Sequence, residues 1–333
     1  MPDIDRLAGW LIRRARAVAS SGAPSPDGLL SRYRGASLDS VVPGRVCRGR
    51  IGRCLAIERE ADTQIAAPSE EDCARSILGQ LQLLFGIGPR RDARLRRDGF
   101  DSIPALLEHD CWRDAAERLL DRLGEPMNPV RVHETLDAWL PASHPLFLCL
   151  VGLTPRERVL FLDLETLGLG GSPVFLAATA RCEASNPRVT QYLARGLDEE
   201  VGLLEQVDRE LVGAELVITY NGKAFDWTVL RERFAYYGMA FPHDPIHIDL
   251  LHHARSAYRD TLPDLRLGTV EHRILGLRRE DDLPSAAVPE FFTAYLNTGN
   301  PGPLLPILAH SYQDVLSLIL LLDRLLRRRD DAG

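Results

Sequence analysis

The stretch VLFLDLETLGLGG, residues 159–171, decides the fold of this chain. Its leading apolar residues predict a buried strand, and the glycines that follow end it. Side chains at alternate positions of a strand share a face, so Asp163 and Glu165 should project together. Two neighbouring carboxylates at the end of a buried strand are either solvated or bound to a divalent cation, which removes their repulsion. This stretch alone leaves both interpretations open.

Length and composition place the chain among ordinary globular proteins. It has 333 residues, enough for two domains or one large one, with 45% hydrophobic and 26% charged residues. No run of eighteen apolar residues occurs, so we expect no membrane partner and a cytoplasmic location. Residues 1–16 predict an amphipathic helix with Leu7, Trp10 and Leu11 on its buried side, not a secretory signal. The sequence identifies no protein partner.

The charge is unevenly distributed. The formal net charge is −7, and residues 1–150 carry equal numbers of basic and acidic residues, so the whole deficit lies in residues 151–333. This is expected if metal ions complete the acidic half. Overall charge gives no argument for nucleic-acid binding, which requires a local basic patch. Six cysteines are scattered without a C-x-x-C pair, which argues against a zinc site.

Residues 85–103, FGIGPRRDARLRRDGFDSI, contain such a basic patch beside a glycine turn. A helical pattern that begins at Glu70 is expected to stop at Gly86, and Pro89 to begin the next helix. The apolar positions of this pattern are Ile77, Leu81, Leu84 and Phe85. Unpaired backbone N–H groups at the start of the second helix would bind a phosphate, and five arginines surround them. The alternative is an ordinary tight turn with solvated arginines.

This turn resembles the helix-hairpin-helix DNA-binding motif. The resemblance implies nucleic-acid contacts at the turn and the following helix, from Gly86, Gly88, Arg90, Arg91 and Arg94. Further helices are expected at 102–109 and 112–123. Residues 125–145 contain four prolines and predict a connector.

The order of elements after residue 150 indicates the fold class. Strands are predicted at 159–165, 174–182, 188–194, 215–220 and 245–248, with helices beginning near Asp198 and spanning 225–237. Three strands in a meander, followed by strands that alternate with helices, predict an α/β mixed sheet flanked by helices. Earlier, residues 45–58 read as one or two short strands without assignable chemistry.

A second polar motif, NGKAFD at residues 221–226, lies where the fourth strand meets a helix. Ligands of open α/β sheets gather at the carboxyl ends of strands, so this motif can face the same crevice as Asp163. Asp226 lies in the first turn of the helix, where it could either bind a metal or answer the helix dipole. Lys223 could contact a phosphate or be an ordinary surface lysine.

A third motif lies on a long apolar helix expected at 304–327. His310 and Asp314 are four residues apart and therefore share a face. Asp314 has apolar neighbours and no basic partner on its own helix, which favours a metal or a salt bridge. His310 could activate a water beside a metal carboxylate, or could be a structural residue of the apolar face.

In this order, Asp163-x-Glu165, Asn221-x-x-x-Phe225-Asp226 and His310-x-x-x-Asp314 resemble the three motifs of the DEDD exonuclease superfamily. The surrounding sequence resembles one branch, the YprB-like ribonuclease H-like domain. The similar segments are residues 220–223, 248–255, 270–276, 279–284, 288–290 and 295–299. The resemblance covers roughly residues 155–325.

The resemblance implies a ribonuclease H-like fold and a two-metal site. Two Mg²⁺ or Mn²⁺ ions would be held by Asp163, Glu165, Asp226 and Asp314, with His310 as the residue that orients the attacking water. Superfamily members place a tyrosine four residues before the last aspartate or a histidine five before it, whereas here His310 is four before. Thr166, Asn221 and Lys223 are the expected substrate contacts beside the metals.

We therefore expect a metal-dependent nuclease, a 3′→5′ exonuclease acting on DNA or RNA. The alternatives are a structure-specific endonuclease on the same fold and a non-catalytic nucleic-acid-binding protein. The expected organisation is an N-terminal helix with short strands (1–69), a helix-hairpin-helix-like region (70–124), a connector (125–150), the nuclease domain (151–327) and a tail (328–333). Residues 167–173 and 277–303 are expected to shape the substrate entrance.

Overall fold

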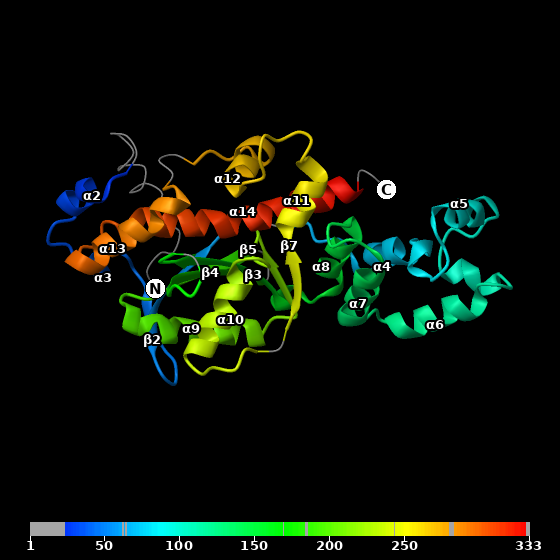
Figure 1. The fold of residues 1–333 in the computed structure, drawn as a ribbon, viewed down its shortest axis with the longest axis horizontal. Coiled ribbons are helices and arrows are strands. Elements are labelled where there is room, and N and C mark those ends of the chain that lie inside the picture. Colours follow the sequence, from blue (N-terminus) through cyan, green and yellow to red (C-terminus); the bar gives the residue numbers. More distant parts are fainter. Residues whose placement is uncertain are drawn as a thin grey trace.

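The computed structural model describes residues 24–61, 63, 65–168, 170–183, 186–242, 244–279 and 283–330, and the helix predicted at 1–16 lies outside them. The strands of the described residues are β1 (Arg45–Arg48), β2 (Arg53–Glu60), β3 (Val159–Thr166), β4 (Val174–Glu183), β5 (Asn186–Leu193), β6 (Leu216–Thr219) and β7 (Ile246–Asp249). They form a seven-stranded sheet in the order β1-β2-β5-β4-β3-β6-β7 (Figure 1).

The sheet is mixed, as the order of elements predicted. β3 pairs antiparallel with β4 and parallel with β6, and β6 pairs parallel with β7. The predicted bounds of β3 to β7 differ from those observed by no more than two residues at each end. The α/β fold class, a mixed sheet flanked by helices, is confirmed.

β1 and β2 extend this sheet beyond the predicted nuclease domain. β2 runs antiparallel to β5, from the pair Leu55 and Leu193 to the pair Glu60 and Arg188. Four consecutive residues of β2, at 54–57, are buried, as expected for a strand covered on both faces. The segment 1–69, predicted as a separate region, therefore supplies strands to the same sheet as residues 151–327.

Helices cover both faces of the sheet (Figure 1). The helices of this part of the chain are α2 (Pro26–Arg32), α3 (Leu38–Val41), α9 (Glu200–Val212), α10 (Asp226–Tyr236), α11 (Leu250–Tyr258), α12 (Leu267–Val270), α13 (Val288–Thr298) and α14 (Leu304–Asp330). Shorter turns are η5 (Arg156–Arg158), η6 (Leu197–Glu199), the π-helical η7 (Glu271–Leu275) and η8 (Ser285–Ala287). α14 includes the first residues of the predicted tail, 328–330.

The alternation of side chains along β3 orients the acids. Leu160 and Leu162 belong to the core formed with α9 and α10, whereas Val159 and Phe161 belong to the core formed with α14. Because successive side chains of a strand point to opposite faces, the odd-numbered residues of β3 face α14. Asp163 and Glu165 continue this odd-numbered row beyond the last core residue.

α14 is long and apolar enough to cross a membrane by length and composition. However, 61% of its most apolar eighteen-residue window is buried inside the protein. The helix packs against β3, β4, β5, α11 and α13. Its apolar composition is accounted for by this core position.

Residues 70–153 form a helical lobe at one end of the long axis (Figure 1). Its elements are α4 (Glu70–Leu78), η2 (Leu81–Leu83), α5 (Pro89–Arg97), η3 (Pro104–Glu108), α6 (Arg113–Leu123), α7 (Pro129–Trp139), η4 (Pro145–Cys149) and α8 (Leu150–Leu153). The helix expected to run from Glu70 to Gly86 ends at Leu78, before Gly79, and a 3-10 turn follows. The expected helix at 102–109 is also a 3-10 turn.

The connector expected at 125–150 contains a full helix. α7 begins where Asn128 accepts a hydrogen bond from the backbone N–H of Arg131 through its side chain, and Pro129 occupies the first helical position. Proline is well tolerated there because the first N–H groups of a helix have no partner within it. The prolines that indicated a loop therefore mark the start of a helix.

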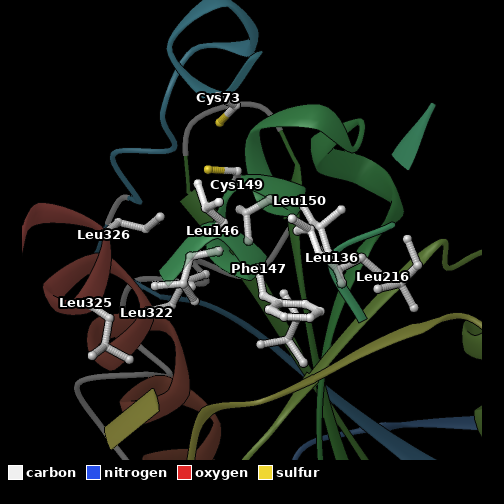
Figure 2. Close-up of a cluster of buried hydrophobic side chains, with 14 of the residues drawn as sticks. Cys73, Leu136, Leu146, Phe147, Cys149, Leu150, Leu216, Leu322, Leu325 and Leu326 are labelled. Atoms are coloured by element: carbon white, nitrogen blue, oxygen red, sulfur yellow. The ribbon is translucent and has the colours of Figure 1, made fainter. Parts of the chain in front are cut away.

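A continuous apolar core joins the helical lobe to the sheet (Figure 2). Figure 2 shows Cys73 of α4, Leu136 of α7 and Phe147 of η4 in the same cluster as Leu216 of β6 and Leu322 of α14. All are buried, and removal of this apolar surface from water favours docking of the lobe. The lobe therefore packs on the sheet through its own core residues.

Candidate active site

Asp163 and Glu165 lie at the carboxyl end of the central strand β3. The pairing of β3 with β4 changes register between Glu165 and Thr166, which is a β-bulge at the strand end. β3 is flanked there by the shorter strand β6, whose pairing with β3 reaches only Phe161. The two carboxylates therefore project beyond the end of the β3–β6 pairing, toward α14.

Asp226 reaches β3 from the first residue of α10. Its Oδ1 accepts a hydrogen bond of 3.1 Å from the backbone N–H of Leu164, which lies between the two acids of β3. The side chain thus turns toward the strand. Asp226 therefore does more than interact with the helix dipole, because its carboxylate lies beside the strand that carries Asp163 and Glu165.

The turn that carries Asp226 is held by Asp249, at the end of β7. Asp249 accepts hydrogen bonds from the backbone N–H groups of Asn221 (2.7 Å), Lys223 (3.2 Å) and Leu251 (3.0 Å). Asn221 adopts a left-handed conformation with φ of 63°, which asparagine tolerates better than most residues. A carboxylate that accepts several N–H groups fixes the path of the chain between β6 and α10.

His310 and Asp314 reach the same place from α14. The Nε2 atom of His310 lies 3.5 Å from Oδ2 of Asp314 and 3.9 Å from Oε1 of Glu165. One possible ligand atom from each of these three residues lies within 4.8 Å of the others. The predicted sharing of a helix face is therefore borne out in space, and it brings α14 to the end of β3.

We refer to Asp163, Glu165, Asp226 and Asp314 as the acidic cluster. Removal from water, with the charges of the other three acids, raises the pKa of Asp163 well above its usual value. Removal from water also raises the pKa of Glu165 to about 8 and that of Asp226 to about 7, and it raises that of Asp314. Ionised together, these groups are costly without a cation.

One guanidinium approaches the acidic cluster. Arg279 forms a two-point ion pair with Glu271, at 2.5 and 2.7 Å, and an ion pair with Asp314. Glu271 is buried, with only 1% of its side chain exposed, and accepts a further hydrogen bond from Ser317 of α14. Of the alternatives for Asp314, a metal or a salt bridge, the salt bridge is present, and its basic partner comes from outside the helix.

Arg279 also determines the tautomer of His310. Its Nη1 lies 2.9 Å from Nδ1 of His310, and a guanidinium can only donate. Nδ1 is therefore the acceptor, and the ring proton lies on Nε2, the atom that faces Glu165 and Asp314. In this arrangement the imidazole donates toward the acids and has no site at which to accept a proton from water.

The acidic cluster fits a hard divalent cation. Oδ2 of Asp163 is buried and has no hydrogen-bond partner among the described residues. Buried polar atoms are almost always paired, so this oxygen indicates a ligand atom. Carboxylate oxygens in a converging set are the ligands preferred by Mg²⁺ and Mn²⁺. Asp163, Glu165, Asp226 and Asp314 could hold such ions.

The other residues expected to bind substrate are Thr166, at the end of β3, and Asn221 and Lys223, in the turn before α10. Oγ1 of Thr166 donates to the backbone oxygen of Gly168, at 2.5 Å. Asn221 and Lys223 are exposed. Burial lowers the pKa of His133, His247 and His253, and the charge of Lys223 lowers each of these pKa values further. Substrate contacts by Thr166, Asn221 and Lys223 stay predictions.

The expected hairpin contacts lie far from the acids in sequence and in space, in the helical lobe (Figure 1). Gly88 precedes α5 as its N-cap, and Gly86 has a φ of +91°. Arg91 donates to the backbone oxygen of Gly86, at 2.5 Å, and Arg94 lies 3.6 Å from Asp98. Arg90 is exposed. Nucleic-acid binding by these residues stays a prediction.

Asp249, Glu271 and Arg279 were not predicted as part of the site. All three fall within segments that carried the family resemblance, 248–255, 270–276 and 279–284, but no spacing marked them as partners of the acids. Arg279 lies in the segment 277–303 that was expected to line the substrate entrance. Because a loop brings it to α14, only the fold shows the contact.

Comparison with known proteins supplies the family. Residues 160–326 match the model of the RNase_H superfamily, about half of the chain. The uncharacterized protein YprB of Bacillus subtilis (strain 168) is 36% identical over 169 residues, which are 49% of this chain and 41% of YprB. The chain thus spans about two-fifths of the length of this relative.

One solved structure is more distantly similar. It is the family B DNA polymerase from the hyperthermophilic archaeon Pyrobaculum calidifontis, with a TM-score of 0.41 and 19% identity over 52% of this chain and 25% of the polymerase. The sequence resemblance to YprB and to ribonuclease H-like domains is confirmed by the family match and by YprB. The helix-hairpin-helix-like turn lies outside residues 160–326 and stays a prediction.

Proposed function

Since the chain belongs to the RNase_H superfamily, we propose that it is a metal-dependent nuclease that hydrolyses phosphodiester bonds in DNA or RNA from the 3′ end. The observation that carries the proposal is the convergence of the acidic cluster from β3, α10 and α14. Four carboxylates with raised pKa values are costly to a fold that does not use them. A cation site that binds a phosphate would explain why the fold keeps these four carboxylates together.

The four carboxylates would hold two Mg²⁺ or Mn²⁺ ions. Such a pair, when bound, supplies a hydroxide nucleophile at neutral pH and offsets the charge on the attacking and leaving oxygens of the phosphate. The remaining chemistry belongs to the side chains around the acids.

Three residues of the chain position the acidic cluster. Asp249 holds the turn that aims Asp226 at β3. Arg279, anchored by Glu271, contributes a fixed positive charge beside Asp314, where a phosphate oxygen would approach. His310 donates from Nε2 toward Glu165 and Asp314, so we assign it an orienting role while Arg279 donates to its Nδ1.

We further propose that the helical lobe binds the nucleic-acid backbone. α5 begins at Pro89, and the positive end of its helix dipole lies beside exposed arginines. This combination suits a phosphate. The lobe and the acidic cluster would then contact the same strand at separate positions.

The test is a cleavage assay with single- and double-stranded DNA and RNA, each labelled at the 5′ end, in Mg²⁺, Mn²⁺ or EDTA. We expect a ladder of progressively shorter labelled products in metal and none in EDTA. Asp163→Asn should abolish cleavage, with circular dichroism showing a folded protein. The exposed Asp260, changed to asparagine, is the matched control and should cleave like the wild type.

The products separate the two enzyme classes. Trimming from an end requires a free 3′ terminus, so a circular single strand should resist. Cleavage of circles or of 3′-blocked strands would favour a structure-specific endonuclease on this fold. Absence of metal-dependent cleavage on every substrate, or full activity in Asp163→Asn, would overturn the nuclease proposal.

A further inference from the structure

An exposed aromatic pair lies beside the glycine turn of the helical lobe. Phe85 is 81% exposed and Trp139, the last residue of α7, is 46% exposed. Their ring centroids are 6.0 Å apart, at an angle of 47°. The sequence placed Phe85 among the apolar positions of a helix that stops at Gly86, but the helix ends at Leu78, and Phe85 lies beyond it on the surface.

The outward position of Phe85 is fixed by its neighbours. Leu84 and Ile87, on either side of the Phe85-Gly86 step, are only 4% exposed. Gly86 has a φ of +91°, which residues with a side chain rarely adopt, and Arg91 donates to its backbone oxygen. Because the chain is buried on both sides of this step, the ring of Phe85 is held in contact with solvent.

The surroundings of the pair are cationic. α5 begins three residues after Gly86 and carries five arginines against one aspartate. All five arginines are exposed, while Arg96 pairs with Asp92, Arg91 with the backbone oxygen of Gly86, and Arg94 with Asp98. Exposed aromatic rings next to exposed arginines match the parts of a surface that binds single-stranded nucleic acid.

We propose that Phe85 and Trp139 form a stacking platform for an unpaired base, while the adjacent turn and arginines hold its phosphates; this rests on the proposed nucleic-acid substrate. Two rings 6.0 Å apart and inclined at 47° leave no room for a base between them, so the base stacks on an outer ring face. Base faces are covered within a duplex. The platform therefore selects a single strand or a frayed end.

The experiment measures binding in EDTA, so that cleavage plays no part. Fluorescence anisotropy compares a deoxythymidine oligomer of about 12 nucleotides, within the usual site sizes, with an abasic oligomer of the same length. The wild type should bind the oligomer with bases at least tenfold more tightly. Phe85→Ala and Trp139→Ala should each weaken its binding roughly tenfold to a hundredfold and leave abasic binding unchanged.

Further variants test whether a ring, or only apolar surface, is needed. Phe85→Leu keeps apolar surface without a π face and should bind as weakly as Phe85→Ala, whereas Phe85→Tyr should retain affinity. Tyr236, 71% exposed on α10, is the matched aromatic control, and Tyr236→Ala should bind like the wild type. If Phe85→Leu and Trp139→Ala bind the oligomer with wild-type affinity, the stacking platform is refuted, and the exposed aromatic pair would instead suit a protein partner.

Failure of the platform is distinguishable from failure of the nuclease proposal. Equal binding of both oligomers by the wild type would refute base stacking even if the cleavage assay succeeds. Selective binding of the oligomer with bases would support the platform even if no cleavage is found.

Discussion

The acidic cluster predicts that a substitution which removes activity will stabilise the metal-free protein. Glu165→Gln removes one of four mutually repelling carboxylates and keeps nearly the same volume. Burial raises the pKa of Glu165 from 4.5 to about 8. At 1.36 kcal/mol per pKa unit, this corresponds to at most about 5 kcal/mol of destabilisation at pH 8. Because the four acids relieve one another by protonation, we expect a gain of about 1–3 kcal/mol from the substitution.

The gain should depend on pH in a defined direction. Between the pKa of Glu165 in the unfolded chain and its raised value in the folded one, the folded protein binds more protons, so the free energy of unfolding falls as pH rises. The advantage of Glu165→Gln should therefore be small near pH 4.5 and largest near pH 8. The buried His247 and His253, whose pKa values are lowered, affect both proteins equally and cancel in the difference.

Metal should reverse the order of the two proteins. Mn²⁺ at a hundred times its dissociation constant stabilises a protein by about 2.7 kcal/mol. We expect this stabilisation by Mn²⁺ in the wild type and a much smaller one in Glu165→Gln. Calorimetry in EDTA and in Mn²⁺, at several pH values, measures both effects, and 1 kcal/mol corresponds to about 2–4 °C in domains of 150–250 residues.

The control for this experiment is Glu117→Gln, an exposed glutamate of α6 that should show neither effect. Glu165→Gln that is less stable than the wild type at pH 8 in EDTA would refute the electrostatic reasoning. So would a difference that does not change between pH 4.5 and 8. Either result would mean that the carboxylate is stabilised without a cation.

Three further predictions concern the residues that position the acidic cluster and the lobe. Arg279→Gln leaves Glu271 buried without its partner and should destabilise the metal-free protein by about 3–5 kcal/mol in urea unfolding. The double variant Glu271→Gln/Arg279→Gln should recover most of this stability, and the exposed control Arg278→Gln should show no loss. Asp249→Ala removes the acceptor of three backbone N–H groups, so it should lower the free energy of unfolding by about 1–3 kcal/mol and abolish most of the cleavage rate. Asp249→Asn should show intermediate effects. An unchanged cleavage rate would mean that the turn held by Asp249 does not position the site. Leu136→Ala in the shared core should cost about 2–5 kcal/mol, and a single unfolding transition would indicate that lobe and sheet unfold together.

The acids could be predicted because local periodicity determines their direction. Asp163 and Glu165 follow the two-residue repeat of a strand, and His310 and Asp314 follow the four-residue repeat of a helix. Each motif predicts only that its own side chains point together. The resemblance to the DEDD exonuclease superfamily supplied the rest, since it implies that the three motifs meet in one site.

The residues that were missed depend on contacts between distant segments. Arg279 reaches Asp314 through an irregular loop, and no pattern specifies that path. β1 and β2 were visible as strands, but the pairing of β2 with β5 is between residues more than 120 positions apart. Phe85 fitted a helical pattern, but the helix ends before Gly79, and Phe85 lies on the surface.

Arg279 gives the site a charge balance that the four acids alone would not have. With the acids ionised, Glu271 offsets the charge of Arg279, so two divalent ions would bring the whole group to neutrality and leave the guanidinium as a local positive charge beside Asp314. A guanidinium at this position attracts a phosphate oxygen of the substrate, and the four carboxylates with two ions lack such a donor without Arg279. The same charge opposes ion binding, since like charges repel at short range. We therefore expect Arg279→Gln to bind Mn²⁺ more tightly by calorimetric titration and the nucleic acid less tightly, and weaker binding of both would contradict this balance.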